Sequence, residues 1–234
     1  MQLFYNSEIK STDTTFQFDK EESKHIIKVL RKRGGDVIHI TNGKGTLFHS
    51  EISLESEKKC EVKIIKIEDF EPKNYHLHIA IAPTKMNDRL EWFLEKATEI
   101  GIDEISPIIC DHSERKTFKI DRAVKIIQGA MKQSNQFYLP KIYEPISFND
   151  FMKKENNSTK FIAHCEEDKK DLFKNSIQPN QNILILIGPE GDFSTKEIAL
   201  ALKNNFIPVS LGNTRLRTET AGIVACHTAA LINE

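Results

Sequence analysis

Residues 75–234 alternate between short apolar runs and longer segments whose apolar residues recur at helical spacing. The run "ILILI" at 183–187 is apolar at every position, which is typical of a strand buried on both faces of a sheet. The segment that begins near residue 88 carries apolar residues at helical spacing until Gly101, namely Leu90, Phe93, Leu94, Ala97 and Ile100. Repeated alternation of this kind predicts an α/β fold with a largely parallel sheet.

Helix starts are marked by capping signals. Ser194 and Glu197 form a capping box, with Phe193 and Ile198 at the hydrophobic-staple positions. Asp88 with Glu91 three residues on has the same spacing, and we expect it to start the helix of residues 88–100. A further helix is expected over roughly residues 119–135.

Residues 1–72 follow a different pattern, in which short alternating runs are separated by turn signals such as "NGKG" at 42–45. One short helix is expected within "DKEESKHIIKVLRKRGGD", ended by Gly34 and Gly35, with four residues facing inward: His25, Ile26, Val29 and Leu30. This predicts a small β-barrel domain at 1–72, followed by an α/β domain at 73–234.

Composition narrows the class of protein. The 234 residues are 39% hydrophobic and 29% charged with a net charge of −1, so nucleic acid would have to bind a local basic patch. The N-terminus lacks the apolar core of a signal peptide, and no apolar run approaches the roughly 18 residues of a membrane span. The four cysteines are far apart, which favours buried reduced thiols in a cytoplasmic protein without a membrane partner.

The turn "GPEG" at 188–191, directly after the buried strand, is a candidate ligand loop. Glu190 and Asp192 would repel a pyrophosphate, and Pro189 removes one N–H donor. The spacing also matches neither common phosphate-binding motif. The turn therefore favours a neutral or cationic ligand, with an ordinary tight turn as the alternative.

The segment 209–231 repeats this design, since an apolar strand ends in Leu211 and Gly212 and a helix rich in small residues follows a polar loop. Both loops are expected at the carboxyl edge of one sheet, where open α/β sheets bind ligands. His164 and Cys165 end the strand "TKFIAHC" at the same edge, and a minor role in lining the pocket is expected for them.

Together, "LIGPEGDFSTKE" and "LGNTRLRTETA" resemble the RsmE family of ribosomal RNA methyltransferases, which belong to the SPOUT class. "HIIKVLRKRGGD" with "NGKG" is similar to the family's PUA-like RNA-binding domain, and "KMNDRLEWFLEKATEIG", "SERK" and "KQSNQFYLPKI" resemble its methyltransferase domain. The resemblance covers nearly the whole chain. It implies a trefoil-knotted α/β domain with a mostly parallel sheet, preceded by a small PUA-like β-barrel.

The resemblance implies S-adenosylmethionine as cofactor, which has no phosphate and carries a cationic sulfonium. The implied cofactor-binding residues are Ile187, Gly188, Glu190, Gly191, Leu211, Gly212, Leu216, Arg217, Thr220 and Ala221. The implied reaction is methylation of N3 of a uridine in small-subunit (16S) ribosomal RNA, which requires an unpaired base. Arg217 could stabilise an anionic uracil oxygen. Glu219 is the nearest candidate base, with a helix-start role as the alternative.

A basic cluster near the first helix is the candidate RNA-binding site: Lys28, Arg31, Lys32 and Arg33. The alternative is a solvated helix face. By resemblance the partners are small-subunit ribosomal RNA, free or in the 30S subunit, and a second copy of the chain. No metal is expected, since His76 and His78 share a strand face without acidic or cysteine partners at ligand spacing.

Three positions depart from the family pattern. Asp192 stands where a second glycine is common, Thr214 where an arginine is common, and Gln136 where another arginine is usual. The competing hypotheses are a non-catalytic RNA-binding or assembly factor that has kept the fold, and a nucleotide-phosphate enzyme, which Glu190 and Asp192 disfavour.

Overall fold

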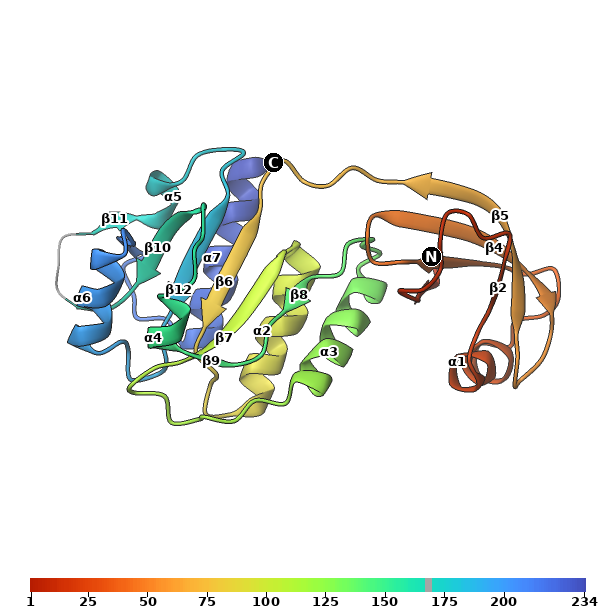
Figure 1. The fold of residues 1–234 in the computed structure, drawn as a ribbon, viewed down its shortest axis with the longest axis horizontal. Helices are drawn as coiled ribbons and strands as arrows, with labels where there is room; N and C mark the ends of the chain where they lie inside the picture. Colours follow the sequence, from red (N-terminus) through yellow and green to blue (C-terminus); the bar gives the residue numbers. More distant parts are fainter. Residues whose placement is uncertain (167–169) are drawn as a thin grey trace. The chain divides into compact units, whose positions relative to one another are not determined.

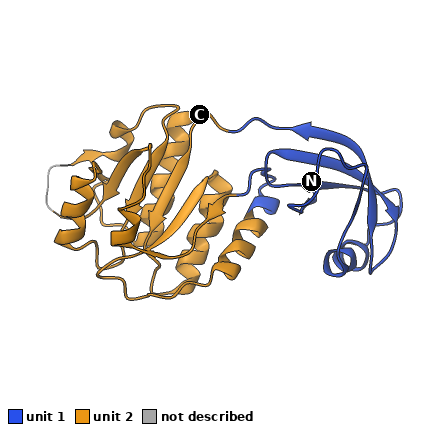
Figure 2. Cartoon of the chain, viewed as in Figure 1, with its two compact units in different colours: residues 1–72, 131–139 blue, residues 73–130, 140–234 orange. Residues whose placement is uncertain are grey.

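The computed structural model describes residues 1–166 and 170–234. The chain divides into two compact units, coloured separately in Figure 2. The first comprises residues 1–72 with 131–139, and the second comprises residues 73–130 with 140–234.

The first unit is built on a curled five-stranded sheet with the order β1-β3-β4-β5-β2. Its strands are β1 (Leu3–Tyr5), β2 (Thr15–Gln17), β3 (Val37–Thr41), β4 (Thr46–Leu54) and β5 (Glu61–Asp69). Two register shifts between β4 and β5 interrupt the ladder, and such irregularities bend a strand. The sheet closes around buried Phe4, Ile38 and Phe48. The predicted small β-domain is therefore a half-barrel with β1 and β2 at its edges.

The short helix of this unit differs from the predicted one. It consists of α1 (Lys20–Lys24) and a single π-helical stretch, η1 (His25–Val29), in which the Leu30 N–H donates to the His25 carbonyl. The wider π turn rotates the following side chains. Ile26 and Ile27 are therefore buried, whereas Val29 is 65% exposed and the prediction that it faces inward is wrong.

Residues 131–139 pack on the hairpin turn of the first unit. The Gly45 N–H donates to the Phe137 carbonyl at 2.9 Å, and the Tyr138 hydroxyl donates to the Phe70 carbonyl at 2.6 Å. Gly45 has a φ of 94°, and a Cβ there would overlap the Tyr138 ring, so the turn requires glycine. The predicted boundary at residues 72/73 places this segment in the second domain, because no local pattern signals a long-range contact.

The second unit contains an eight-stranded parallel sheet within its described residues, in the order β11-β13-β10-β12-β6-β7-β8 with β9 also paired to β7. The strands are β6 (Leu77–Ile81), β7 (Glu104–Ile109), β8 (Lys141–Ile142), β9 (Ile146–Ser147), β10 (Thr159–Ala163), β11 (Asp171–Leu172), β12 (Ile183–Ile187) and β13 (Ile207–Ser210). All five residues of β12 are buried between β10 and β6. The predicted parallel α/β sheet is confirmed.

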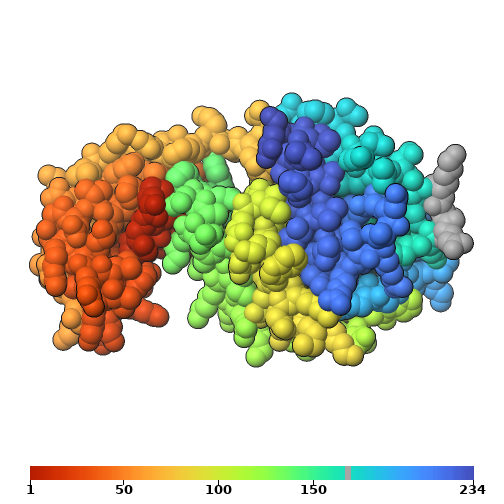
Figure 3. Space-filling view, turned by 180° about the vertical axis from the view of Figure 1, so that it is seen from behind, coloured from red at the N-terminus to blue at the C-terminus, as the bar shows by residue number. Residues whose placement is uncertain are grey.

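Helices cover both faces of this sheet (Figure 1). They are α2 (Asn87–Ile100), α3 (Ile120–Gln133), α4 (Phe148–Phe151), α5 (Phe173–Ser176), α6 (Thr195–Lys203) and α7 (Thr218–Asn233). α2 and α7 lie side by side on one face, as Figure 3 shows from behind. On the other face, residues of α4 and α6 share a core with Ala80, Ile162 and Leu186.

The capping predictions had different outcomes. Ser194 and Glu197 form the complete capping box of α6, as predicted. Gly101 ends α2 with a φ of 107°, also as predicted. Asp88 is not an N-cap, because α2 already begins at Asn87 and Met86 precedes it without a side-chain cap.

Gly222 of α7 allows α7 to approach α2 closely. A Cβ at Gly222 would lie 2.6 Å from Cε2 of Phe93, a fully buried ring of α2. We expect Gly222→Ala to lower the free energy of unfolding by about 1–3 kcal/mol, because the overlap outweighs the helix propensity of alanine.

The matched control for this prediction is Gly129→Ala in α3, where a Cβ would meet nothing within 4 Å. There the higher propensity of alanine should raise stability by up to about 1 kcal/mol. Urea denaturation of both variants measures the two changes, and equal stabilisation by both would contradict the close-packing argument.

Candidate active site

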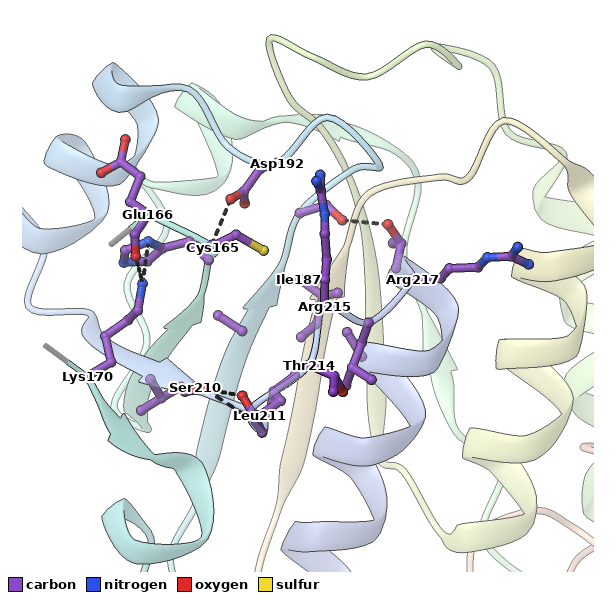
Figure 4. A pocket seen from close by; sticks show the side chains of 18 of the residues that line it. Cys165, Glu166, Lys170, Ile187, Asp192, Ser210, Leu211, Thr214, Arg215 and Arg217 are labelled. Atoms are coloured by element: carbon purple, nitrogen blue, oxygen red, sulfur yellow. Dashed lines mark hydrogen bonds between the residues drawn. The ribbon is translucent and has the colours of Figure 1, made fainter. Parts of the chain in front are cut away.

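A cavity of about 670 Å³ lies where β10, β12 and β13 end, at the carboxyl edge of the sheet (Figure 4). Residues 163–166, 187–190 and 209–218 contribute to its walls, together with Lys170, Asp192 and Ala221. The two glycine-ended strands flank β10 in the sheet, so their loops converge as the sequence analysis expected.

Most of the predicted cofactor-binding residues line this cavity. They are His164, Ile187, Gly188, Glu190, Leu211, Gly212, Leu216, Arg217 and Ala221. Gly191 and Thr220 are not among the lining residues. Gly191 faces His112, whose Nδ1 lies 3.1 Å from the Gly191 carbonyl oxygen.

The acidic residues of the glycine turn accept hydrogen bonds from backbone N–H groups, including those of neighbouring loops. Asp192 Oδ2 accepts the Cys165 N–H at 2.7 Å, and Asp192 Oδ1 accepts the Phe193 N–H at 2.8 Å. Glu190 Oε1 accepts the Lys85 N–H at 2.9 Å. Both carboxylates therefore accept hydrogen bonds from backbone N–H groups. The sequence alone does not predict this role.

The same turn is fixed on its other side by the loop before α7. The Thr218 hydroxyl donates to the Gly188 carbonyl at 3.0 Å, and Arg215 Nη2 donates to the Glu190 carbonyl at 3.3 Å. Thr218 is buried, so this link is shielded from water. The two loops of the cavity thus form one connected wall.

Two lining residues near β10, Glu166 and Lys170, carry no signal in the local sequence and were not predicted. Lys170 Nζ lies 3.1 Å from Nδ1 of His164 and also donates to the Glu166 carbonyl. Cys165 is the exposed member of the four cysteines, which corrects the expectation that all are buried. Partial burial nevertheless raises the pKa of its thiol, and Asp192 adds to the increase.

The two candidate catalytic residues occupy different environments. Arg217 is exposed at the start of α7 and lines the cavity, where Figure 4 shows its side chain diverging from that of Arg215. Glu219 is buried and does not line the cavity, and its Oε1 lies 3.8 Å from Nε of Arg89 on α2. Glu219 Oε2 has no hydrogen-bond partner among the described residues.

Within residues 1–166 and 170–234, no group of three or more His, Cys, Asp and Glu side chains is placed to hold a metal ion. The helices of the same residues include none with the length and apolar character of a membrane span.

Comparison with known proteins identifies the family. The family model described as RNA methyltransferase domain matches residues 71–230, and the RNA methyltransferase PUA domain matches residues 18–65. The chain belongs to the RNA methyltransferase family. The Ribosomal RNA small subunit methyltransferase E of Buchnera aphidicola is 34% identical over 90% of this chain and 85% of that protein. The resemblance to the RsmE family is thereby confirmed.

Solved structures of this family have the same fold. A probable rRNA-methyltransferase from Porphyromonas gingivalis superposes with a TM-score of 0.92 at 39% identity, covering 100% of this chain and 98% of that chain. The Ribosomal RNA small subunit methyltransferase E of Neisseria gonorrhoeae, solved bound to S-adenosyl methionine, gives 0.86 at 27% identity, with 100% and 98% covered. A methyltransferase from Legionella pneumophila with bound SAM gives 0.87 at 27% identity, with 99% and 98% covered.

Asp192 provides a test of how the cavity wall is held. Its φ of 65° favours glycine, so Asp192→Gly should relieve backbone strain while it removes the hydrogen bond to the Cys165 N–H. We expect Asp192→Gly to weaken binding of S-adenosylmethionine about tenfold, because a hydrogen bond to a charged acceptor contributes about 1.5–3 kcal/mol.

Asp192→Asn is the matched control, since asparagine tolerates the same backbone conformation and keeps one acceptor oxygen. It should lose less affinity than Asp192→Gly in isothermal titration calorimetry. If Asp192→Gly binds the cofactor as tightly as the wild-type protein or more tightly, the Asp192 side chain does not contribute to the cavity wall.

Proposed function

We propose that this protein transfers a methyl group from S-adenosylmethionine to N3 of a specific uridine in small-subunit 16S ribosomal RNA. The observation that carries the proposal is the cavity in which both glycine-ended loops meet. Its place at the carboxyl edge of a parallel sheet is where open α/β folds bind ligands. The SAM-bound structures of similar proteins from Neisseria and Legionella support the choice of cofactor.

The residues of the cavity suit this cofactor. Ile187, Leu211 and Leu216 offer apolar contacts for an adenine ring, and the exposed Gly212 leaves its backbone accessible. No phosphate-binding motif is present, which agrees with a cofactor that has no phosphate. When bound, S-adenosylmethionine would supply an electrophilic methyl group on a sulfonium.

Arg217 is the residue that we assign to activating the acceptor base. N3 of uridine is a weak nucleophile until it loses its proton, so catalysis gains from a donor that stabilises the resulting negative charge on the uracil oxygens. The exposed guanidinium of Arg217 lines the cavity and has no acidic partner within 4 Å among the described residues. Glu219 lies outside the cavity, so we assign it to holding Arg89.

The basic cluster of the first unit is the proposed contact to the RNA backbone. Lys28, Arg31 and Arg33 are exposed, and Lys32 is half-buried. Arg33 Nη1 already lies 2.6 Å from Glu55 Oε1, whereas the guanidinium of Arg31 forms no such pair among the described residues. Arg31 is therefore the freer group for a phosphate.

Replacing Arg31 by glutamine should weaken binding to ribosomal RNA about three- to tenfold and reduce the salt slope of log K by about one. Arg33→Gln is the matched control and should change both quantities less, since Glu55 competes with phosphate for that side chain. Filter binding across a salt series measures both. Equal effects of the two substitutions would favour a solvated helix face without a specific contact.

We also propose, from the family resemblance, that the chain forms a trefoil knot in its second unit, acts as a homodimer and works in the cytoplasm. Multi-angle light scattering during size-exclusion chromatography tests the dimer. A mass of about one chain at micromolar concentration would overturn that part of the proposal.

The deciding experiment is methyl transfer from labelled S-adenosylmethionine to small ribosomal subunits that lack base methylation, with naked RNA in parallel. We expect one N3-methyluridine at one site, located by mass spectrometry of the nucleosides. Failure to label either substrate, by a protein that binds the cofactor, would favour a non-catalytic RNA-binding factor.

A further inference from the structure

A second cavity of about 450 Å³ lies at the opposite edge of the parallel sheet, where the strands begin. Lys160, Leu184, His78 and Glu104 form one row across β10, β12, β6 and β7, because each is the register partner of the next. Apart from Leu184, all of this row is polar or charged. The central strands β6 and β12 are otherwise apolar throughout, so this row of polar groups requires an explanation.

The floor of the cavity is a buried hydrogen-bonded group. The His78 side chain is only 7% exposed, and its Nε2 lies 2.9 Å from the Ser106 hydroxyl. Glu104 Oε2 accepts the Tyr143 hydroxyl at 2.9 Å and lies 3.5 Å from His78 Nδ1, which has no hydrogen-bond partner.

The ionisation of the floor follows from these surroundings. Burial lowers the pKa of His78 to about 4, so its imidazole is neutral near pH 7. Contact with His76, followed by the Tyr143 hydrogen bond, lowers the pKa of Glu104 to about 2, so its carboxylate is charged. Burying a polar atom without a hydrogen-bond partner, such as His78 Nδ1, costs free energy, and perturbed groups in a cleft mark candidate binding sites.

The rim of the cavity carries three lysines and one glutamate, Glu155, and its walls include aromatic side chains. Lys153, Lys154 and Lys160 line it together with Tyr143 and Phe206. Lys154 Nζ lies 5.7 Å from the Tyr143 ring centroid and Lys160 Nζ lies 5.6 Å from that of Phe206. Lys153 is paired with Asp150, which leaves Lys154 and Lys160 as the better partners for an anion.

We propose that this second cavity binds a guanosine monophosphate unit, with its phosphate at Lys154 and Lys160 and its base toward Glu104. Among the bases, guanine presents two adjacent N–H donors on one edge, which a carboxylate can accept together. The aromatic walls suit a flat ring, and the volume is within the range of small-ligand pockets.

The unit would be either a free nucleotide or a guanosine within RNA, and the two share this chemistry. In either case it is not the base that receives the methyl group, since the two cavities lie at opposite edges of the sheet. The site does not depend on the methyl-transfer proposal.

The test measures binding of radiolabelled guanosine monophosphate by equilibrium dialysis. We expect adenosine monophosphate to bind at least tenfold more weakly than guanosine monophosphate. The double substitution Lys154→Gln with Lys160→Gln should weaken guanosine monophosphate at least tenfold. The matched control is Lys119→Gln with Lys125→Gln, which removes two exposed lysines outside the cavity and should change nothing.

Glu104→Gln tests the contact to the base. It should lower the ratio of the affinities for guanosine and adenosine monophosphate, while the part of the affinity that comes from the phosphate changes less. Binding of S-adenosylmethionine by every variant shows that each is folded. If a single-stranded RNA that ends in guanosine displaces the labelled nucleotide, the ligand is a guanosine within RNA. If this RNA does not displace the labelled nucleotide, the ligand is the free nucleotide. A folded wild-type protein that does not bind guanosine monophosphate, or binds it equally after the lysine substitutions, overturns the proposal.

Discussion

Gly188→Val is expected to reduce the affinity for S-adenosylmethionine by more than about 100-fold and to abolish methyl transfer. A Cβ at Gly188 would lie 3.1 Å from two ring carbons of Phe193 and 3.3 Å from its backbone nitrogen. Phe193 is buried, so the ring has little room to move away. The branched side chain would therefore displace the turn and distort the cavity wall to which it belongs.

Calorimetric titration with the cofactor, together with methyl transfer to small subunits, measures this effect. Gly129→Val on the exposed surface of α3 is the matched control and should bind the cofactor normally. Binding of ribosomal RNA should survive Gly188→Val, because the proposed RNA contacts are in the first unit. Wild-type cofactor affinity in Gly188→Val would contradict the assignment of the cavity.

Arg217→Gln is expected to lower the methyl-transfer rate at saturating cofactor by about 10²–10³-fold, the usual effect of removing one donor that stabilises a developing anion. The thermal unfolding temperature should change little, since the side chain is exposed. If saturating cofactor restores the wild-type rate, Arg217 only binds the cofactor. The activation of uridine would then belong to another group.

Arg215→Gln is the matched control for Arg217→Gln. Arg215 also lines the cavity, but it donates to the Glu190 carbonyl and so belongs to the wall. We expect a smaller loss, mainly in cofactor affinity. Single-turnover kinetics with saturating cofactor distinguishes the two effects.

Local sequence patterns were sufficient for the elements that position the site. The all-apolar run of β12 required a strand covered on both faces, and the capping box at Ser194 fixed the start of α6. The two glycine-ended strands implied neighbouring loops at one sheet edge, and nine of the eleven predicted cofactor-binding residues line the cavity there. The strand, cap and loop inferences depend on neighbours within a few residues, whereas the cofactor-binding residues were implied by the family resemblance.

Other features could not be inferred in this way. The weak capping signal at Asp88 was wrong, because α2 already begins at Asn87 and Met86 occupies the N-cap position. The π turn at His25–Val29 reversed the predicted environment of Val29. The start of α2 and the π turn both depend on how the segment packs against the rest of the protein. The apolar periodicity of a single helix does not contain this information.

The sequence by itself determined the class of the protein, the order of its main strands and helices and the two loops that form the candidate active site, but not the short elements β8, β9, α4, β11 and α5. Only the tertiary structure decided that Asp192 and Glu190 accept backbone N–H groups from other loops, and that residues 131–139 pack with residues 1–72. Local conformation is encoded by neighbouring residues, whereas these contacts join residues that are 27 to more than 100 positions apart and become specific only when the sheet has formed.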